Sequence, residues 1–155
     1  MPLDANLRVG LVGAGYISEF HARALKRVPN ARLVGLTDVV TARAAALAAR
    51  FNIPNVFPTM EAMMDEGVDV IHILTPPESH ARLAIAALNR GCHVLVEKPL
   101  AMNELEVDSI TAAAAAAQKS VCVNHSMMYD RLPASLHTVV RAGFLELRRI
   151  RRAFL

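Results

Sequence analysis

The chain has 155 residues, of which 54% are hydrophobic and only 5% aromatic, and its formal net charge is +3. This length predicts one main domain, and the composition predicts a core of small aliphatic side chains, as in helices packed on a sheet. No apolar run reaches the ~18 residues of a membrane span and the N-terminus lacks a signal-peptide pattern, so we expect a cytoplasmic protein without membrane contact.

The first predicted unit is a strand, a tight glycine turn and a helix. A short apolar run over residues 8–12 predicts a buried strand, and a helical pattern begins near Tyr16. Gly13 can adopt a positive φ in the turn, and Gly15 has no side chain to keep a diphosphate from the backbone. Because the helix directs free N–H groups and the positive end of its dipole at this turn, we expect an anion to bind there.

Two further positions bear on the identity of that anion. Ser18 occupies the third small position of a dinucleotide fingerprint, and its hydroxyl is expected to bond to the preceding helical turn. A second strand over residues 32–37 ends at Asp38, 23 residues after Gly15, near the ~20 expected for an acid that binds the adenosine ribose. The Asp38 carboxylate would repel a 2′-phosphate, which favours NAD, whereas Arg43 leaves NADP open. A cap or turn role is the alternative for Asp38.

The rest of the chain alternates helical and extended patterns. Thr59 and Asn103 are predicted helix N-caps. The predicted helices cover residues 41–50, 59–66, 78–90 and 103–117, and the predicted strands cover residues 56–57, 68–74, 93–96 and 121–123. Such alternation predicts an α/β fold with a doubly wound parallel sheet, the Rossmann fold.

Polar residues follow several of these strands at the point where each ends. Because ligands of such sheets bind outside the carboxyl ends of the strands, we expect these residues to converge on a cofactor. They are Gly13, Asp38, Thr75, Glu97-Lys98 and Asn124-His125.

Residues that mark metal sites, disulfides or nucleic-acid surfaces lack the patterns that these functions need. The six histidines have no paired spacing such as His-Glu-x-x-His, so no metal site is predicted. Cys92 and Cys122 adjoin or lie in apolar runs and are expected to be buried thiols in a reducing compartment. Five arginines lie between residues 141 and 155, but without interleaved aromatic residues they indicate a solvated surface rather than nucleic-acid binding.

The motifs at the predicted strand ends resemble the glucose-fructose oxidoreductase and inositol dehydrogenase family, Gfo/Idh/MocA, from Arg8 to about Gly143. The Glu-Lys-Pro tripeptide after a buried strand, combined with a Thr-Pro-x-x-x-His turn, is far more specific than the glycine loop. In chain order the matching segments are Gly13-Ala14-Gly15-Tyr16-Ile17-Ser18, Thr75-Pro76-Pro77-Glu78-Ser79-His80, Glu97-Lys98-Pro99-Leu100 and Asn124.

The resemblance implies a dehydrogenase that transfers a hydride between NAD, or NADP, and a sugar, cyclitol or similar secondary alcohol. Lys98 is implied as the catalytic residue beside the nicotinamide, where it polarises or relays the proton of the reacting hydroxyl. Glu97 is implied to hold the loop and to tune the lysine, and Pro99 to fix a cis bend. For His80, a solvent-facing position in the first turn of a helix is the alternative, and for His125 a structural role is favoured over a catalytic one. The implied cofactor-binding residues are Gly13, Gly15, Tyr16, Ile17, Asp38, Thr75, Pro76, His80, Glu97, Lys98 and Asn124.

The resemblance also implies a division of the chain. Residues 1–124 correspond to the cofactor-binding domain and residues 125–155 to the start of a second α/β domain, with a helix over 130–142 and a strand from near Leu147. Members of the family continue into a substrate domain. We therefore expect this chain to bind cofactor without turning over substrate alone, and the full-length form to be a homo-oligomer.

Three other functions compete with this one. A non-catalytic NAD-binding module, a regulator or an isolated domain, would use the same cleft. A methyltransferase also joins a glycine turn to an acid, but it commonly has a glycine where this chain has Ile17, and it has no use for residues 97–99. A short-chain dehydrogenase is disfavoured because Pro133, and not lysine, follows Tyr129 by four positions.

Overall fold

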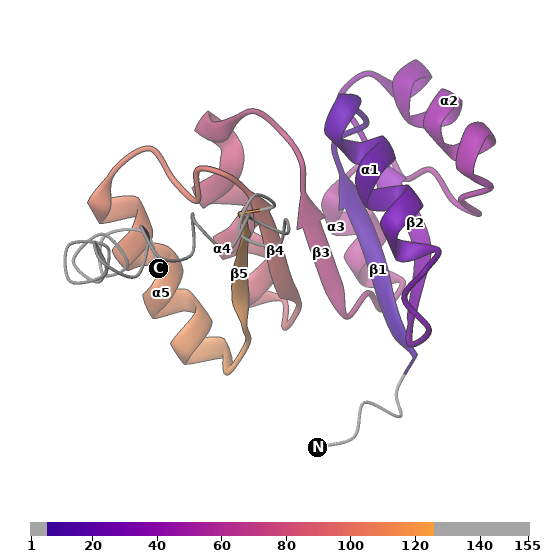
Figure 1. Cartoon of the computed structure of the whole chain (residues 1–155). Helices are drawn as coiled ribbons and strands as arrows, with labels where there is room; N and C mark the ends of the chain where they lie inside the picture. Colours follow the sequence, from indigo (N-terminus) through magenta and orange to yellow (C-terminus); the bar gives the residue numbers. More distant parts are fainter. Residues whose placement is uncertain (1–5, 126–155) are drawn as a thin grey trace, which may run out of the picture.

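The computed structural model describes residues 6–125, which form a five-stranded sheet flanked by helices (Figure 1). The strands are β1 (Leu7–Val12), β2 (Ala31–Thr37), β3 (Val70–Ile73), β4 (His93–Glu97) and β5 (Val121–Asn124). The helices are α1 (Tyr16–Leu25), α2 (Thr41–Phe51), α3 (Met60–Asp65), α4 (His80–Asn89) and α5 (Glu104–Ala117), with a 3-10 turn η1 (Pro77–Ser79) before α4. The predicted second domain lies outside the described residues except for His125.

The strand order is β2-β1-β3-β4-β5 and every neighbouring pair is parallel, which confirms the predicted doubly wound fold. The chain winds from β1 to β2 on one side and then returns to β3 on the other side of β1. The strand order reverses between β1 and β3, and ligands in such folds usually bind outside the carboxyl ends of the two strands at this point.

The predicted strand at residues 56–57 is only an isolated bridge between Val56 and Leu36 of β2. Leu36 donates to the Asn55 carbonyl and accepts from the Phe57 N–H, so the segment follows the sheet edge for one residue. Pro58 comes next and has no backbone N–H with which to continue a ladder.

The helices cover the sheet in two layers that match the alternation of side chains along the strands. One apolar cluster joins α1 and α2 to β1 and β2, and another joins α3, α4 and α5 to the opposite face. Along β1, Leu11 belongs to the first cluster and Val12 to the second. Figure 1 shows the chain crossing the sheet from α1 and α2 at one end to α5 at the other.

Burial of the two cysteines differs. Cys92 is buried as predicted, but the prediction for Cys122 is wrong, because its side chain is exposed. Val121 and Val123 of β5 pack against the cluster of α4 and α5, whereas Cys122 points to the other face with its neighbour Leu95. Among residues 6–125, no helix covers that face of β5.

Two helices begin at the N-cap residues that the sequence predicts. The Thr59 hydroxyl accepts from the Ala62 N–H at 3.1 Å, and Asn103 Oδ1 accepts from the Glu106 N–H at 3.0 Å, which confirms both predicted caps. The Glu106 carboxylate accepts from the N–H of Met102, the residue before the Asn103 cap.

One buried strand carries a titratable side chain inside the apolar core. His72 of β3 is 8% exposed, and its Nδ1 lies 3.0 Å from Nδ1 of His21 on α1. Burial and the neighbouring His21 lower the pKa of His72 from 6.5 to about 3. His72 is therefore neutral in the folded chain at neutral pH.

Two glycines of the turn after β1 differ in how much room they have, which gives a matched pair of variants. At Gly13, φ is +105° and an added Cβ would lie 2.7 Å from the Leu74 carbonyl oxygen, whereas a Cβ at Gly15 would meet no atom within 4 Å. We expect Gly13→Ala to lower the free energy of unfolding by about 1–3 kcal/mol and Gly15→Ala by less than about 1 kcal/mol. Urea unfolding measures both; equal losses would contradict the close packing at Gly13.

The burial of His72 also makes stability depend on pH. The unfolded chain binds a proton at this residue near pH 6.5, and the folded chain does so only near pH 3, so stability is lost as the pH falls through this window. From His72 alone we expect a loss of about 2 kcal/mol between pH 7 and pH 5. His72→Asn should reduce this dependence of the free energy of unfolding on pH, whatever the stability of the variant at pH 7. If urea unfolding shows that the variant loses as much stability between pH 7 and pH 5 as the wild-type chain, His72 does not cause the dependence.

Candidate functional site

The predicted site residues come together at one edge of the sheet. In the strand register, Val12 pairs with Thr37 and Ile73, Ile73 pairs with Val96, and Val96 pairs with Val123. Since the strands are parallel, the residues that follow this row also share one edge. They are Asp38, Gly13, Leu74, Glu97 and Asn124.

The glycine turn is held by backbone and side-chain hydrogen bonds. The Gly13 N–H donates to the Thr37 carbonyl at 2.8 Å, and the Ser18 hydroxyl donates to the Gly13 carbonyl at 2.8 Å. Ser18 therefore bonds to the turn itself and not, as predicted, to the preceding turn of the helix. It is fully buried, so a small side chain is needed there for α1 to approach β1.

The N-terminus of α1 has room and donors for an anion. Gly15 is the N-cap, it is exposed, and no side chain caps the helix. No atom lies within 4 Å of the position of a Cβ on Gly15, so there is space beside the helix N-terminus, and the helix dipole favours negative charge there. These features fit the diphosphate of a dinucleotide. Beside them, Tyr16 is exposed with its ring against Phe20, and Ile17 is half-buried against the core.

Asp38 links the second strand to the glycine turn. Its Oδ2 accepts from the Ala14 N–H and its Oδ1 accepts from the Val40 N–H, both at 2.7 Å. The N-cap of α2 is Val40, so Asp38 makes a turn but is not the helix cap. Each carboxylate oxygen has a further lone pair for a ribose hydroxyl.

The Thr75-Pro76 turn is joined to the Lys98-Pro99 turn by a buried histidine. His80 is 0% exposed, with Nε2 2.8 Å from the Thr75 carbonyl and Nδ1 2.7 Å from the Pro99 carbonyl. It is therefore not a solvent-facing residue of the first helical turn, which was the alternative. Pro76 and Lys98 are exposed and Thr75 is half-buried, so these turns present the three residues toward the edge.

The carboxylate of Glu97, at the start of the Lys98 loop, accepts hydrogen bonds from two other elements. It accepts from Asn124 Nδ2 and, at 3.1 Å, from His21 Nε2. Burial raises the pKa of the Glu97 carboxyl, but these hydrogen bonds outweigh burial and hold the pKa below its usual value. Glu97 is thus ionised at neutral pH. The Lys98–Pro99 peptide bond is cis, and His125 is exposed beyond β5.

Sequence reasoning missed both His21 and His72 as part of this site. His21 lies three residues after Ser18, so the two share the buried face of α1. This spacing was a detectable signal that His21 faces the sheet, although it did not identify Glu97 or His72 as its partners.

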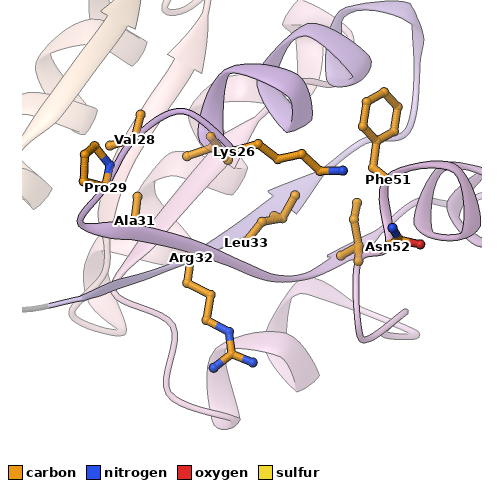
Figure 2. A pocket seen from close by; sticks show the side chains of 10 residues that line it. Lys26, Val28, Pro29, Ala31, Arg32, Leu33, Phe51 and Asn52 are labelled. Atoms are coloured by element: carbon orange, nitrogen blue, oxygen red, sulfur yellow. The ribbon is translucent and has the colours of Figure 1, made fainter.

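A cavity of about 380 Å³ lies elsewhere, at the amino end of β2. Residues Ala31, Arg32 and Leu33 line one wall, and the segment after α1 lines another (Figure 2). Figure 2 shows Lys26 reaching toward Phe51, and its ammonium lies 5.5 Å from the ring centroid. The cavity is at the opposite end of β2 from Asp38, so it is separate from the site at the strand ends.

Residues 6–125 contain neither a metal site nor a membrane span. In this part of the chain, no cluster of three or more histidine, cysteine, aspartate or glutamate residues is arranged to hold a metal ion. No helix there is both long enough and apolar enough to cross a membrane.

Comparison with known proteins identifies relatives of the chain. The model of the oxidoreductase family Gfo/Idh/MocA, described as an NAD-binding Rossmann fold, matches residues 7–125. The chain is 30% identical over 139 residues to UDP-N-acetylglucosamine 3-dehydrogenase of Acidithiobacillus ferrooxidans, covering 90% of this chain and 42% of that enzyme. It is 27% identical over 138 residues to myo-inositol 2-dehydrogenase of Thermotoga maritima, covering 88% of this chain and 41% of that enzyme.

A solved structure agrees with these relatives. The dehydrogenase WlbA of Bordetella pertussis, in complex with NADH and UDP-GlcNAcA, superposes with a TM-score of 0.73 at 30% identity, covering 77% of this chain and 35% of that one. The chain spans less than half the length of the two curated dehydrogenases that it matches. The matched residues include the glycine turn, Asp38, the Thr75 turn and the Glu97-Lys98-Pro99 loop. The chain belongs to the Gfo/Idh/MocA family of oxidoreductases and carries its NAD-binding Rossmann domain.

Proposed function

We propose that this chain is the cofactor-binding part of an NAD-dependent dehydrogenase that acts on a sugar, a cyclitol or a similar secondary alcohol. The observation that carries the proposal is the placement of the Lys98 loop on the same sheet edge as the Gly13–Gly15 turn and Asp38. The similar dehydrogenases of UDP-N-acetylglucosamine and myo-inositol support a sugar or polyol as the substrate class.

The chain's own residues account for how a dinucleotide would be held. The first turn of α1 would bind the diphosphate beside Gly15, and the Asp38 carboxylate would accept from the ribose hydroxyls. Asp38 also fixes the turn through Ala14, so one side chain shapes the diphosphate site and recognises the ribose. Its negative charge disfavours a 2′-phosphate, and Arg43, which is exposed, is the residue that could offset this repulsion.

The nicotinamide of a bound cofactor supplies the hydride chemistry of such an enzyme. Lys98 would polarise the reacting hydroxyl or relay its proton, since its exposed side chain lies at the edge where Thr75 and Pro76 also lie. Glu97, which His21 and Asn124 hold in place, immediately precedes Lys98, and the buried ring of His80 lies between a carbonyl group of each turn.

A second candidate function is a non-catalytic NAD-binding module. It uses the same residues for the cofactor and differs only in that Lys98 meets no substrate.

The binding site is tested by thermal unfolding of the chain with NAD and, separately, with NADP. At a free cofactor concentration of about 100 times Kd, binding adds roughly 2.7 kcal/mol to stability and raises the midpoint. We expect NAD to stabilise the chain more than NADP because of the charge of Asp38. Asp38→Asn, which removes that charge, should reduce the difference between the midpoint shifts that NAD and NADP cause.

Gly15→Ala is the matched control for this experiment. Its Cβ meets no protein atom but would occupy the space of the diphosphate, so it should weaken both cofactors equally and leave their ratio unchanged. A larger shift with NADP than with NAD would overturn the interpretation of Asp38. The absence of a shift with either cofactor would overturn the proposed site.

A further inference from the structure

A chain of buried polar side chains connects the helix of the glycine turn to the loop of Lys98. His72 of β3, His21 of α1 and Glu97 of β4 follow one another at 3.0 Å and 3.1 Å, and Asn124 of β5 also donates to Glu97. Both histidines are only 8% exposed. Four elements that are distant in sequence therefore meet in a single hydrogen-bonded cluster, which we call the histidine–glutamate cluster.

The direction of each hydrogen bond in this cluster follows from which atoms can donate. An ionised Glu97 only accepts, so His21 must carry a proton on Nε2 to bond to it. Of the two Nδ1 atoms that face each other across the His21–His72 contact, one donates and the other accepts. Asn124 Nδ2 also lies near His21 Nε2, at 3.4 Å, but the carboxylate is closer and is charged, so it is the acceptor for His21.

The cluster acts on Lys98 through the backbone. Glu97 immediately precedes Lys98, so the anchoring of its carboxylate to His21 and Asn124 fixes where the chain enters the Lys98–Pro99 turn. His21 lies six residues after Gly15 on the same helix, so it moves with the N-terminus of α1. His21 is thus the link between the diphosphate end and the lysine end of the site.

We propose that His21 is a positioning residue that, through the carboxylate of Glu97, holds Lys98 in place relative to the N-terminus of α1. This inference rests on the proposed function, in which α1 binds the diphosphate and Lys98 lies beside the nicotinamide. His21 touches neither group itself. It acts by keeping the two ends of the cofactor site at a fixed separation.

An apolar residue at position 21 would pack in the same place but would break the cluster at both ends. Glu97 would lose one of its donors, and Nδ1 of His72 would lose its partner. Buried polar groups without partners are costly, so Glu97 is expected to turn toward other donors and to shift the start of the Lys98 loop.

The test compares the affinity of the chain for NAD and for ADP-ribose, which has the adenosine and diphosphate but no nicotinamide. Calorimetric titration of the wild-type chain, His21→Leu, His21→Gln and Gly15→Ala measures both. We expect His21→Leu to lower the affinity for NAD about tenfold, as for the loss of one hydrogen bond to a charged group. The affinity for ADP-ribose should stay unchanged. His21→Gln, which keeps a donor and an acceptor, should restore most of the NAD affinity. Gly15→Ala should weaken both ligands equally.

The outcomes separate this inference from the proposed function. Equal weakening of NAD and ADP-ribose by His21→Leu, or no rescue by His21→Gln, would show that His21 only supports the fold. If the wild-type chain bound neither ligand, the proposed function would fail and the inference with it.

A second measurement covers the case in which His21→Leu does not fold. Nitrogen-15 spectra of the wild-type imidazoles should show His21 protonated on Nε2. An unprotonated Nε2 would remove the hydrogen bond from His21 to Glu97 and overturn the proposal.

Discussion

All five strands are parallel, so each presents its carboxyl end at the same edge of the sheet, and the placement of the site depends on this constraint. The register aligns Thr37, Val12, Ile73, Val96 and Val123 across the sheet. Whatever follows these residues must lie along one line. The chain places a glycine, two carboxylates and an amide there, which is why residues separated by more than a hundred positions form one site.

Within that edge, the carboxylate of Glu97 is the point at which the elements are joined. A partly buried negative charge is unfavourable unless it is well hydrogen-bonded, and here helix α1 and the neighbouring strand β5 each supply a donor. His80 has a comparable role between two carbonyl groups, which joins the Thr75 turn to the Pro99 turn. The exposed residues of the site therefore rest on a buried polar layer beneath them.

Sequence reasoning succeeded where a local pattern determines the structure. The glycine turn, the Thr59 and Asn103 caps and the alternation of strands and helices are all properties of short segments. It failed where the outcome depends on elements far apart in the chain. The contact of His21 with His72 joins residues 51 positions apart, and the exposure of Cys122 depends on which face of β5 the helices cover. Residues 56–57 formed a single bridge because Pro58 stops the ladder, which the apolar pattern alone did not indicate.

In the proposed function, one NAD molecule spans the sheet edge from the N-terminus of α1 to the Lys98 loop. Titration of the nitrogen-15-labelled chain with NAD, followed through the backbone amide signals, reports on both ends of that span at once. We expect the perturbed amides to cluster at Gly13–Tyr16, Asp38, Thr75 and Lys98, and those of the β2 cavity near Arg32 to stay unchanged. Perturbations confined to that cavity, or to the glycine turn without Lys98, would show that NAD does not bridge the two turns.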